Sequence, residues 1–317
     1  MTDSTRAFLR RVTEPQGLRA LELFRMFAGC TILFQFASAL PARHFLLGPN
    51  GVYPIELAQK TALFGLYGLA ESRFTFDLIY FGSMGIVVIW IAGRALPWST
   101  LAVFVVWRSM HDRLPGLADG GDNLIQLLLI YGALCDLGGV AARYGPTWFV
   151  RARGVLHNFG LLAIWTQTCV VYLVAGTAKL QGEAWLNGTA LYYALSTAEY
   201  TTPLLVGPLL ESPVLLVLLA YLTMLFQIGF PFLVAAGERS RRAALVIAGS
   251  FHLGIVVVMG LTSFGLFMIA ADSTFLSDRE ISRLRNHLSR ARSIAIQRLC
   301  FFNPRLLVQR GKTRLQP

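Results

Sequence analysis

The sequence predicts an all-α protein: a polytopic transmembrane helical bundle of about seven to eight spans with additional interfacial helices. The first observation is composition, because 55% of the 317 residues are hydrophobic and 14% are charged, whereas soluble domains carry about 25% charged residues. The second is a mean hydropathy of +0.57. The third is a series of seven apolar runs, most of them near the roughly 20 residues that one crossing needs.

The apolar runs succeed one another along nearly the whole chain. They lie at about 20–40, 74–93, 97–110, 122–141, 155–178, 212–236 and 243–271. The first run has no small-residue cleavage site, so we expect a retained span rather than a signal peptide. The run at 97–110 is short, and we expect it to be tilted or sheltered by other helices. Two weaker stretches, 53–70 and 189–210, predict interfacial or re-entrant helices.

The basic residues predict three regions and an orientation. Residues 1–18 are a cytoplasmic basic arm, 19–276 the transmembrane domain and 277–317 a basic amphipathic tail. The net charge of +11 is explained by the positive-inside rule and anionic lipid, without a nucleic-acid partner. If successive runs cross the membrane in alternating directions, three basic loops lie on the same side as the arm. They contain Arg94; Arg143, Arg151 and Arg153; and Arg239, Arg241 and Arg242.

This orientation predicts a multi-pass protein of the plasma membrane, surrounded by the lipid bilayer. The three longer polar segments, 41–73, 111–121 and 179–211, then face outside, and we expect the functional site there. The side of the tail stays open. The four cysteines show no pairing pattern and no metal-ligand spacing, so neither a disulfide framework nor a metal site is predicted.

One lysine ends an apolar run in the string VVYLVAGTAKLQGEAWLNG, residues 170–188. Trp165, Tyr172 and Lys179 share one helix face, because seven residues separate each from the next, and Thr168 and Gly176 lie beside them. One interpretation is that Lys179 marks the membrane edge and reaches water by snorkelling, which the spacing alone favours. The other is a desolvated amine that is partly neutral and acts as a base. Gly176 would let another backbone or a flat ligand come close.

Two further polar groups lie in apolar surroundings. Asp119 or Asp122 can cap the helix that follows, or Asp122 can line an outside-facing pocket near the membrane level of Lys179. His252 is either a hydrogen-bonded packing residue or a proton carrier, and Asp272, near the outside end of the same run, can cap or pair.

Seven residues reproduce an ordered Tyr…Ala-Gly-x-x-Lys-Leu…Trp…Gly string: Tyr172, Ala175, Gly176, Lys179, Leu180, Trp185 and Gly188. The segments GLRALELFRMFAGC, GPNGVYP, DGGDNLIQLLL, FPFL, FHLGIVVVMGL and FGLFMIAADSTFL stand in matching order. From about residue 18 to 276 the chain therefore resembles the membrane domain of vitamin K-dependent gamma-glutamyl carboxylases and their bacterial homologues, the horizontally transferred transmembrane (HTTM) domain. No single segment is highly specific, but the ordered set is.

The resemblance implies quinol-dependent chemistry of an oxidoreductase or lyase. In the carboxylases the lysine matching Lys179 is taken as the base that deprotonates a reduced vitamin K-type naphthoquinone. O2 then converts the quinol to an epoxide through a strong base, which removes a glutamate γ proton before CO2 adds. Carried over, the candidate catalytic residues are Lys179, His252 and Asp122, and the candidate cofactor-binding residues are Tyr172, Gly176, Trp185 and Asn123.

Three departures bear on that implication. Ala178 replaces the first of two adjacent lysines of the animal motif, and Gln227 stands where many bacterial relatives have an acid. The chain also ends about 40 residues after its last run, so the soluble peptide-binding domain of the carboxylases is not expected. Quinol oxidation is thus better supported than glutamate carboxylation, and whether the protein is an enzyme stays open.

A second hypothesis is not catalytic. Small bacterial members of the resembled family occur in toxin-peptide systems, so the protein could be a membrane partner for the maturation, export or immunity of a secreted peptide. Lys179 would then be a structural cation. A transporter is a weaker third hypothesis, since the sequence shows no inverted repeat.

Overall fold

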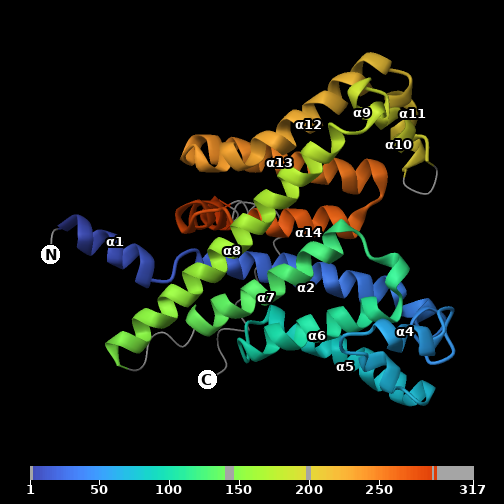
Figure 1. Cartoon of the computed structure of the whole chain (residues 1–317), viewed down its shortest axis with the longest axis horizontal. Coiled ribbons are helices and arrows are strands. Elements are labelled where there is room, and N and C mark those ends of the chain that lie inside the picture. Colours follow the sequence, from blue (N-terminus) through green and yellow to red (C-terminus); the bar gives the residue numbers. More distant parts are fainter. Residues whose placement is uncertain (1–2, 140–145, 198–200, 288, 291–317) are drawn as a thin grey trace, which may run out of the picture. The chain divides into compact units, whose positions relative to one another are not determined.

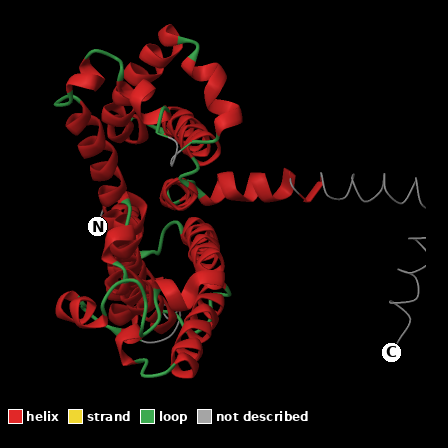
Figure 2. Cartoon of the chain, turned by 90° about the vertical axis from the view of Figure 1, so that its right-hand side faces the viewer, coloured by secondary structure: helices red, strands yellow, loops and turns green. Residues whose placement is uncertain are grey.

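The described part of the protein is all-helical. The computed structural model describes residues 3–139, 146–197, 201–287, 289 and 290, and the regular elements in these ranges are helices joined by loops (Figure 2). The predicted all-α class is therefore confirmed for these residues. Residues 1–275 and 276–317 form two units, and each is described by itself.

The helices of the first unit follow the chain as Figure 1 labels them. The longer ones are α1 (Asp3–Thr13), α2 (Leu18–Ala39), α5 (Arg73–Ile91), α6 (Trp98–Arg113), α7 (Gly120–Gly139), α8 (Thr147–Lys179), α12 (Pro213–Ala235), α13 (Glu238–Met259) and α14 (Thr262–Ser273). Short ones connect them: η1 (Leu40–Ala42), α3 (Arg43–Leu46), α4 (Ile55–Thr61), η2 (Leu66–Leu69), η3 (Pro115–Leu117), α9 (Glu183–Leu186), α10 (Ala190–Leu195) and α11 (Pro203–Leu210).

Five helical segments in the described residues are long and apolar enough to cross a membrane. They are Leu9–Leu46, Arg73–Ile91, Thr147–Lys179, Pro213–Ala235 and Glu238–Met259. These five candidates are fewer than the seven to eight spans predicted. The helix α6 has 16 residues and ends in a charged turn, and α7 contains Asp122, Asn123, Gln126 and Asp136, which reduce its hydropathy.

The last predicted run, 243–271, is divided in two. The helix α13 ends at Met259, and Gly260 follows with a left-handed φ of 69°, a conformation that glycine adopts at little cost. The helix α14 then has 12 residues. At 1.5 Å per residue it is about 18 Å long, which is shorter than the roughly 30 Å hydrocarbon core of a bilayer.

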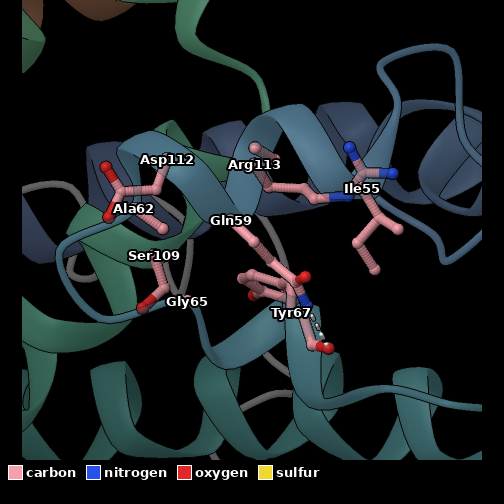
Figure 3. Close-up of a pocket in the computed structure, with 10 residues that line it drawn as sticks. Ile55, Gln59, Ala62, Gly65, Tyr67, Ser109, Asp112 and Arg113 are labelled. Atoms are coloured by element: carbon pink, nitrogen blue, oxygen red, sulfur yellow. Dashed lines mark hydrogen bonds between the residues drawn. The ribbon is translucent and has the colours of Figure 1, made fainter.

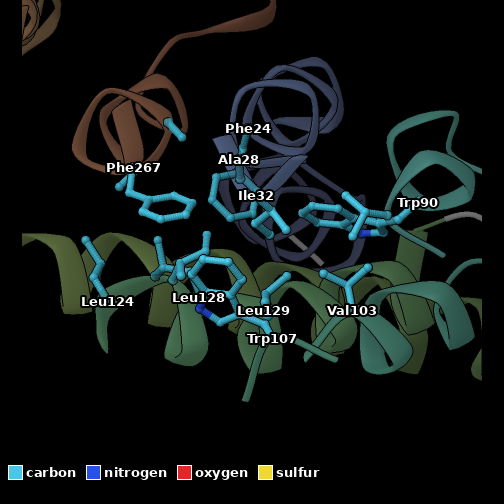
Figure 4. Close-up of a cluster of buried hydrophobic side chains, with 14 of the residues drawn as sticks. Phe24, Ala28, Ile32, Trp90, Val103, Trp107, Leu124, Leu128, Leu129 and Phe267 are labelled. Carbon is cyan, nitrogen blue, oxygen red and sulfur yellow. The ribbon is translucent and has the colours of Figure 1, made fainter. Parts of the chain in front are cut away.

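The hydrophobic core lies where α2, α6, α7 and α14 meet. Phe24, Ala28 and Ile32 of α2 are buried, and so is Phe267 of α14 (Figure 4). Opposite them lie buried residues of α6 and α7, with Trp90 of α5 at one side: Val103, Trp107, Leu124, Leu128 and Leu129. Burial of these side chains supplies the main apolar contacts of the bundle.

Glycines set the close approach of α8 to its neighbours. A Cβ on Gly160 would lie 2.7 Å from the Tyr131 carbonyl oxygen of α7, and one on Gly176 would lie 2.9 Å from the Ile228 backbone nitrogen of α12. Small residues at these positions let helix backbones pack closely, as in membrane bundles generally.

The N-terminal arm is fixed to the start of α8. Asn158 donates hydrogen bonds to the carbonyl oxygens of Val12 and Glu14 at 2.8 and 2.9 Å and accepts one from the Gln16 amide at 2.9 Å. The predicted basic arm thus includes the helix α1, followed by a turn that Asn158 holds.

The second unit begins a helix over residues 278–287. Ser277 and Glu280 form a reciprocal capping box, because the Ser277 amide donates to Glu280 at 2.8 Å and the Glu280 amide donates to Ser277 Oγ at 3.3 Å. The rest of the predicted tail, from residue 291 on, lies outside the described residues.

Candidate functional site

Lys179 is the last residue of α8, and it is half-buried. Its Nζ donates a hydrogen bond to the Ala175 carbonyl oxygen at 3.2 Å and lies 5.0 Å from the ring centroid of Trp185 in α9. An ammonium group over an indole face is held by a cation–π attraction, and a cation also suits the C-terminal end of a helix. The backbone turn after Gly182 brings Trp185 back onto the lysine.

Tyr172 belongs to a different, fully buried group. Its hydroxyl lies 2.9 Å from Nε2 of His252 and donates to Oδ2 of Asp272 at 2.8 Å. The three residues come from α8, α13 and α14, and they are 1%, 1% and 5% exposed. If the Tyr172 hydroxyl donates its hydrogen bond to an ionised Asp272, it can only accept one from His252. The Nε2 of His252 must then carry a proton.

Aromatic rings enclose this Tyr172–His252–Asp272 cluster. Phe230 of α12 stacks on Tyr172 with the ring centroids 3.9 Å apart, and Phe251 and Phe264 flank His252. The Nδ1 of His252 and the Oδ1 of Asp272 have no hydrogen-bond partner among the described residues. Two unsatisfied polar atoms in an apolar interior are unusual in a stable protein, and they make the cluster the most chemically distinctive feature of the core.

Gly176 lies between this cluster and Lys179 along α8. Since Tyr172 and Lys179 are seven residues apart, they are separated by about 10.5 Å along the helix axis. At Gly176 the helix α12 comes into contact, with Gln227 and Ile228 against the glycine. The predicted shared face of Tyr172, Gly176 and Lys179 is thus the face that packs on α12, and Gly176 meets backbone there.

Asp122 is the centre of a third polar group, at the start of α7. It is 2% exposed, and its carboxylate accepts hydrogen bonds from Gln35 Nε2 at 3.0 Å and from the Asp119 amide at 2.9 Å. The Nε2 of His111 lies 3.4 Å from Asp122 Oδ2, while Nδ1 lies 2.9 Å from the Trp107 carbonyl oxygen. Both ring nitrogens of His111 therefore lie against hydrogen-bond acceptors.

The two aspartates of this turn have opposite pKa shifts. Burial raises the pKa of Asp119, and the neighbouring charge of Asp122 adds to that rise. Burial also acts to raise the pKa of Asp122, but hydrogen bonds from His111 and from the Asp119 amide outweigh it, and the pKa lies below its ordinary value. Asp119 and Asp122 thus stabilise the turn before α7, and the expectation that Asp122 lines an outside-facing pocket stays a prediction.

The outside-facing segment predicted at 41–73 is attached to α6 by Arg113. This side chain donates to the carbonyl oxygens of Leu47, Gly48 and Tyr53 at 3.1, 2.6 and 2.6 Å. Figure 3 shows the neighbouring cavity beside Asp112, which accepts a hydrogen bond from the Leu63 amide at 2.8 Å. The cavity has a volume of about 10 Å³, so it can hold no more than about one water molecule.

The structure thus places the predicted site residues in separate groups. Lys179 meets Trp185, and Tyr172 meets His252, but Asp122 contacts neither pair and Asn123 is exposed on α7. The contacts Gln35 and His111 were not expected, although His111 stands eleven residues before Asp122 on the other side of a Pro-Gly turn. Asp272 was expected to cap or pair, and it pairs with Tyr172.

Comparisons with known proteins agree with the resemblance drawn from the ordered motifs. Residues 152–279 match the family model of the HTTM domain. The sporulation-delaying protein SdpB of Bacillus subtilis (strain 168) is 36% identical over 109 residues, which are 33% of this chain and 33% of that protein. The uncharacterized protein YitO of the same strain is 32% identical over 128 residues, 37% of this chain and 40% of that protein.

These matches span between a third and two fifths of the length of the curated relatives. No solved structure matches the chain. The matched region begins in α8 and includes both the Lys179–Trp185 pair and the Tyr172–His252–Asp272 cluster. Residues 152–279 of this chain therefore match the HTTM domain, the family that the ordered motifs resemble.

Proposed function

We propose that this HTTM-domain membrane protein is a partner for the maturation, export or immunity of a secreted peptide. The similarity to SdpB supports the proposal, because small bacterial members of the resembled family occur in toxin-peptide systems. The similarity covers a third of each chain, so the role is inferred from the shared domain and from its site together.

The observation that carries the proposal is the arrangement of Lys179. Its ammonium group is held by the Ala175 carbonyl oxygen and the face of Trp185, at one end of the bundle. It contacts neither the His252 group nor the Asp122 group, so a peptide-binding cation suits it better than a member of a joint catalytic site. Exposed apolar side chains lie on the helices that follow, α9 and α10: Leu186, Tyr192 and Tyr193.

This combination suits a short peptide. Partly exposed aromatic residues give contact area at low entropic cost, and a half-buried cation can pair with a peptide carboxylate. We refer to Lys179, Trp185, Leu186, Tyr192 and Tyr193 as the end surface. By the predicted orientation, it faces the side to which peptides are secreted.

A photo-crosslinking experiment tests the proposal. A benzophenone amino acid at Tyr193 is expected to capture a secreted peptide in producing cells, whereas the same group at Leu78, exposed on α5, is expected to capture none. Lys179→Met should reduce capture, and Lys60→Met, which alters the exposed lysine of α4, should leave it unchanged. Equal capture at Tyr193 and Leu78, or capture independent of Lys179, would count against a peptide-binding end surface.

One observation favours a second candidate, the oxidation of a reduced naphthoquinone with Lys179 as base. The half-buried amine of Lys179 lies on the same helix as Tyr172, which bonds to His252 and Asp272, and the residues stand in the motif order that the resemblance requires. The described residues do not enclose a flat bicyclic ring at either place, since Trp185 covers the amine and Phe230 is stacked on Tyr172.

The second candidate has its own assay. Purified protein is given reduced naphthoquinone and O2, and quinone epoxide is measured by mass spectrometry. Epoxide that forms with wild type and Lys60→Met but is lost with Lys179→Met would establish the lysine-dependent reaction. The absence of epoxide from folded protein, with several naphthoquinols tried, would leave the peptide role as the function of the end surface.

A further inference from the structure

A groove runs along the surface of the bundle between α8 and α12. Its volume is about 400 Å³, and α8 contributes one wall from Leu162 to Leu173. These residues are eleven positions apart, so the wall is about 16 Å long. Both α8 and α12 are among the segments that are long and apolar enough to cross a membrane. The groove therefore opens to the acyl chains of the bilayer rather than to water.

The wall of the groove is fixed by two aromatic side chains. Trp165 and Phe275 are stacked with their ring centroids 5.8 Å apart. The indole Nε1 of Trp165 donates to the Thr274 carbonyl oxygen at 3.0 Å, so its polar atom is satisfied away from the groove. The groove thus presents a preformed apolar surface, which lowers the entropic cost of binding a flexible chain.

One end of the groove carries positive charge. Arg241, near the start of α13, is the charged residue among the described residues that line it. Arg239 and Arg242 stand beside it in the sequence GERSRR, on the side that the positive-inside rule predicts to be cytoplasmic. Basic pockets between membrane helices on that side bind anionic lipid head groups.

We propose that this groove binds an anionic phospholipid, with one acyl chain along α8 and the phosphate at Arg241. The length and apolar lining match a chain, and the guanidinium group matches a phosphate, which it binds with charge-assisted hydrogen bonds. Tyr172 does not line this lipid site, which is independent of the peptide role proposed above.

Native mass spectrometry of the full chain in detergent tests the lipid site. Phosphatidylglycerol and phosphatidylcholine with identical acyl chains are titrated separately, and the bound fractions are compared. Wild type is expected to prefer phosphatidylglycerol. Arg241→Gln should weaken phosphatidylglycerol binding about tenfold, the value of one charge-assisted contact, with little change for phosphatidylcholine. Arg239→Gln, which alters an exposed arginine outside the groove, should keep the preference.

Equal binding of the two lipids by wild type would overturn the proposal in favour of a neutral occupant. An equal loss with Arg239→Gln and Arg241→Gln would show that the basic loop acts as a diffuse charge without a built site, which also overturns it.

A second measurement needs no variant. Cys169 lines the groove, whereas Cys30 is exposed on α2. Added phosphatidylglycerol is expected to slow the alkylation of Cys169 by N-ethylmaleimide in wild type, measured by peptide mass spectrometry, while Cys30 reacts at an unchanged rate. Alkylation of Cys169 at the same rate with and without phosphatidylglycerol would contradict occupancy of the groove.

Discussion

Tyr172 joins three helices through one hydroxyl group, so its removal should be costly. In Tyr172→Phe the Nε2 of His252 and the Oδ2 of Asp272 lose their partner inside the core. We expect a loss of about 1–3 kcal/mol in the free energy of unfolding, which is typical for buried polar groups left unsatisfied. Denaturation in mixed micelles would measure it.

Tyr221→Phe is the matched control for this substitution. The Tyr221 hydroxyl donates to the Leu186 carbonyl oxygen at 2.7 Å, but the side chain is exposed. Its loss should cost about 0.5–1 kcal/mol at most. If the two variants were equally stable, the cluster would contribute no more than a surface contact.

The lowered pKa of Asp122 predicts that the stability of the folded protein falls as the pH is lowered. Because its pKa is lowered in the folded state, its stabilising contribution is present above the unfolded value of about 3.9 and is lost as the pH falls through the folded pKa. Asp122→Asn should destabilise the protein by about 1–3 kcal/mol near pH 7. This difference from wild type should shrink below about pH 4.

The measurement compares wild type with Asp122→Asn across that pH range. Asp119, whose pKa is raised, has the opposite dependence, but it is present in both proteins and largely cancels in the difference. Asn123→Ala changes an exposed neighbour and should show no such trend. A difference between wild type and Asp122→Asn that stays constant down to pH 3 would mean that the Asp122 carboxylate is not held by His111 and Gln35.

The helix face on which a residue lies was predictable from the sequence, but its hydrogen-bond partners were not. The spacing of Tyr172, Gly176 and Lys179 placed them on one helix face, and the structure agrees. The pairing of Tyr172 with Asp272 spans 100 positions, and no periodicity in a single sequence reports a contact at that separation. The same holds for Gln35 and Asp122, which are 87 positions apart.

Gly176 fixes how closely α8 and α12 pack, and this leads to a prediction about the helix pair. In Gly176→Ala the new Cβ would lie 2.8 to 3.0 Å from atoms of Ile228 and Gln227, including the Ile228 backbone nitrogen. Backbone cannot move aside cheaply, so we expect a loss of about 1–3 kcal/mol from overpacking. Unfolding in mixed micelles would report it.

Gly249→Ala provides the opposite control. Gly249 is in α13, and nothing lies within 4 Å of the position that a Cβ would take there. Alanine should therefore stabilise that helix by about 0.5–1 kcal/mol through its higher helix propensity. A neutral or stabilising effect of Gly176→Ala as well would show that α8 and α12 can separate without cost.

Element boundaries were predictable where hydropathy changes and not where it is continuous. The run 74–93 became α5 (Arg73–Ile91), with Ser72 as its N-cap accepting from the Thr75 amide at 3.1 Å. The run 243–271 remains apolar through its break. Only the left-handed conformation of Gly260 ends α13 there, and a hydropathy profile does not register backbone conformation.

At the scale of the whole molecule, the smaller number of candidate spans is compatible with the predicted sidedness. The helices α6 and α7 form consecutive, packed elements between the basic segments near Arg94 and Arg151. Whether this pair crosses the membrane fully or re-enters, an even number of passages returns the chain to the side from which α6 began. The predicted orientation therefore keeps the basic loops together on one side, as the positive-inside rule requires.

That sidedness predicts the outcome of cysteine labelling in intact cells. Asn187→Cys, in the exposed turn after α9, should react with a membrane-impermeant maleimide, because the predicted orientation puts this turn, near the end surface, outside. Arg239→Cys, exposed near the start of α13, should react only after the cells are permeabilised. Each is placed in a chain whose native cysteines are replaced, and that parent is the unlabelled control. Labelling of Arg239→Cys in intact cells would indicate the opposite orientation. The end surface would then face the cytoplasm, where a secreted peptide could meet it only before export.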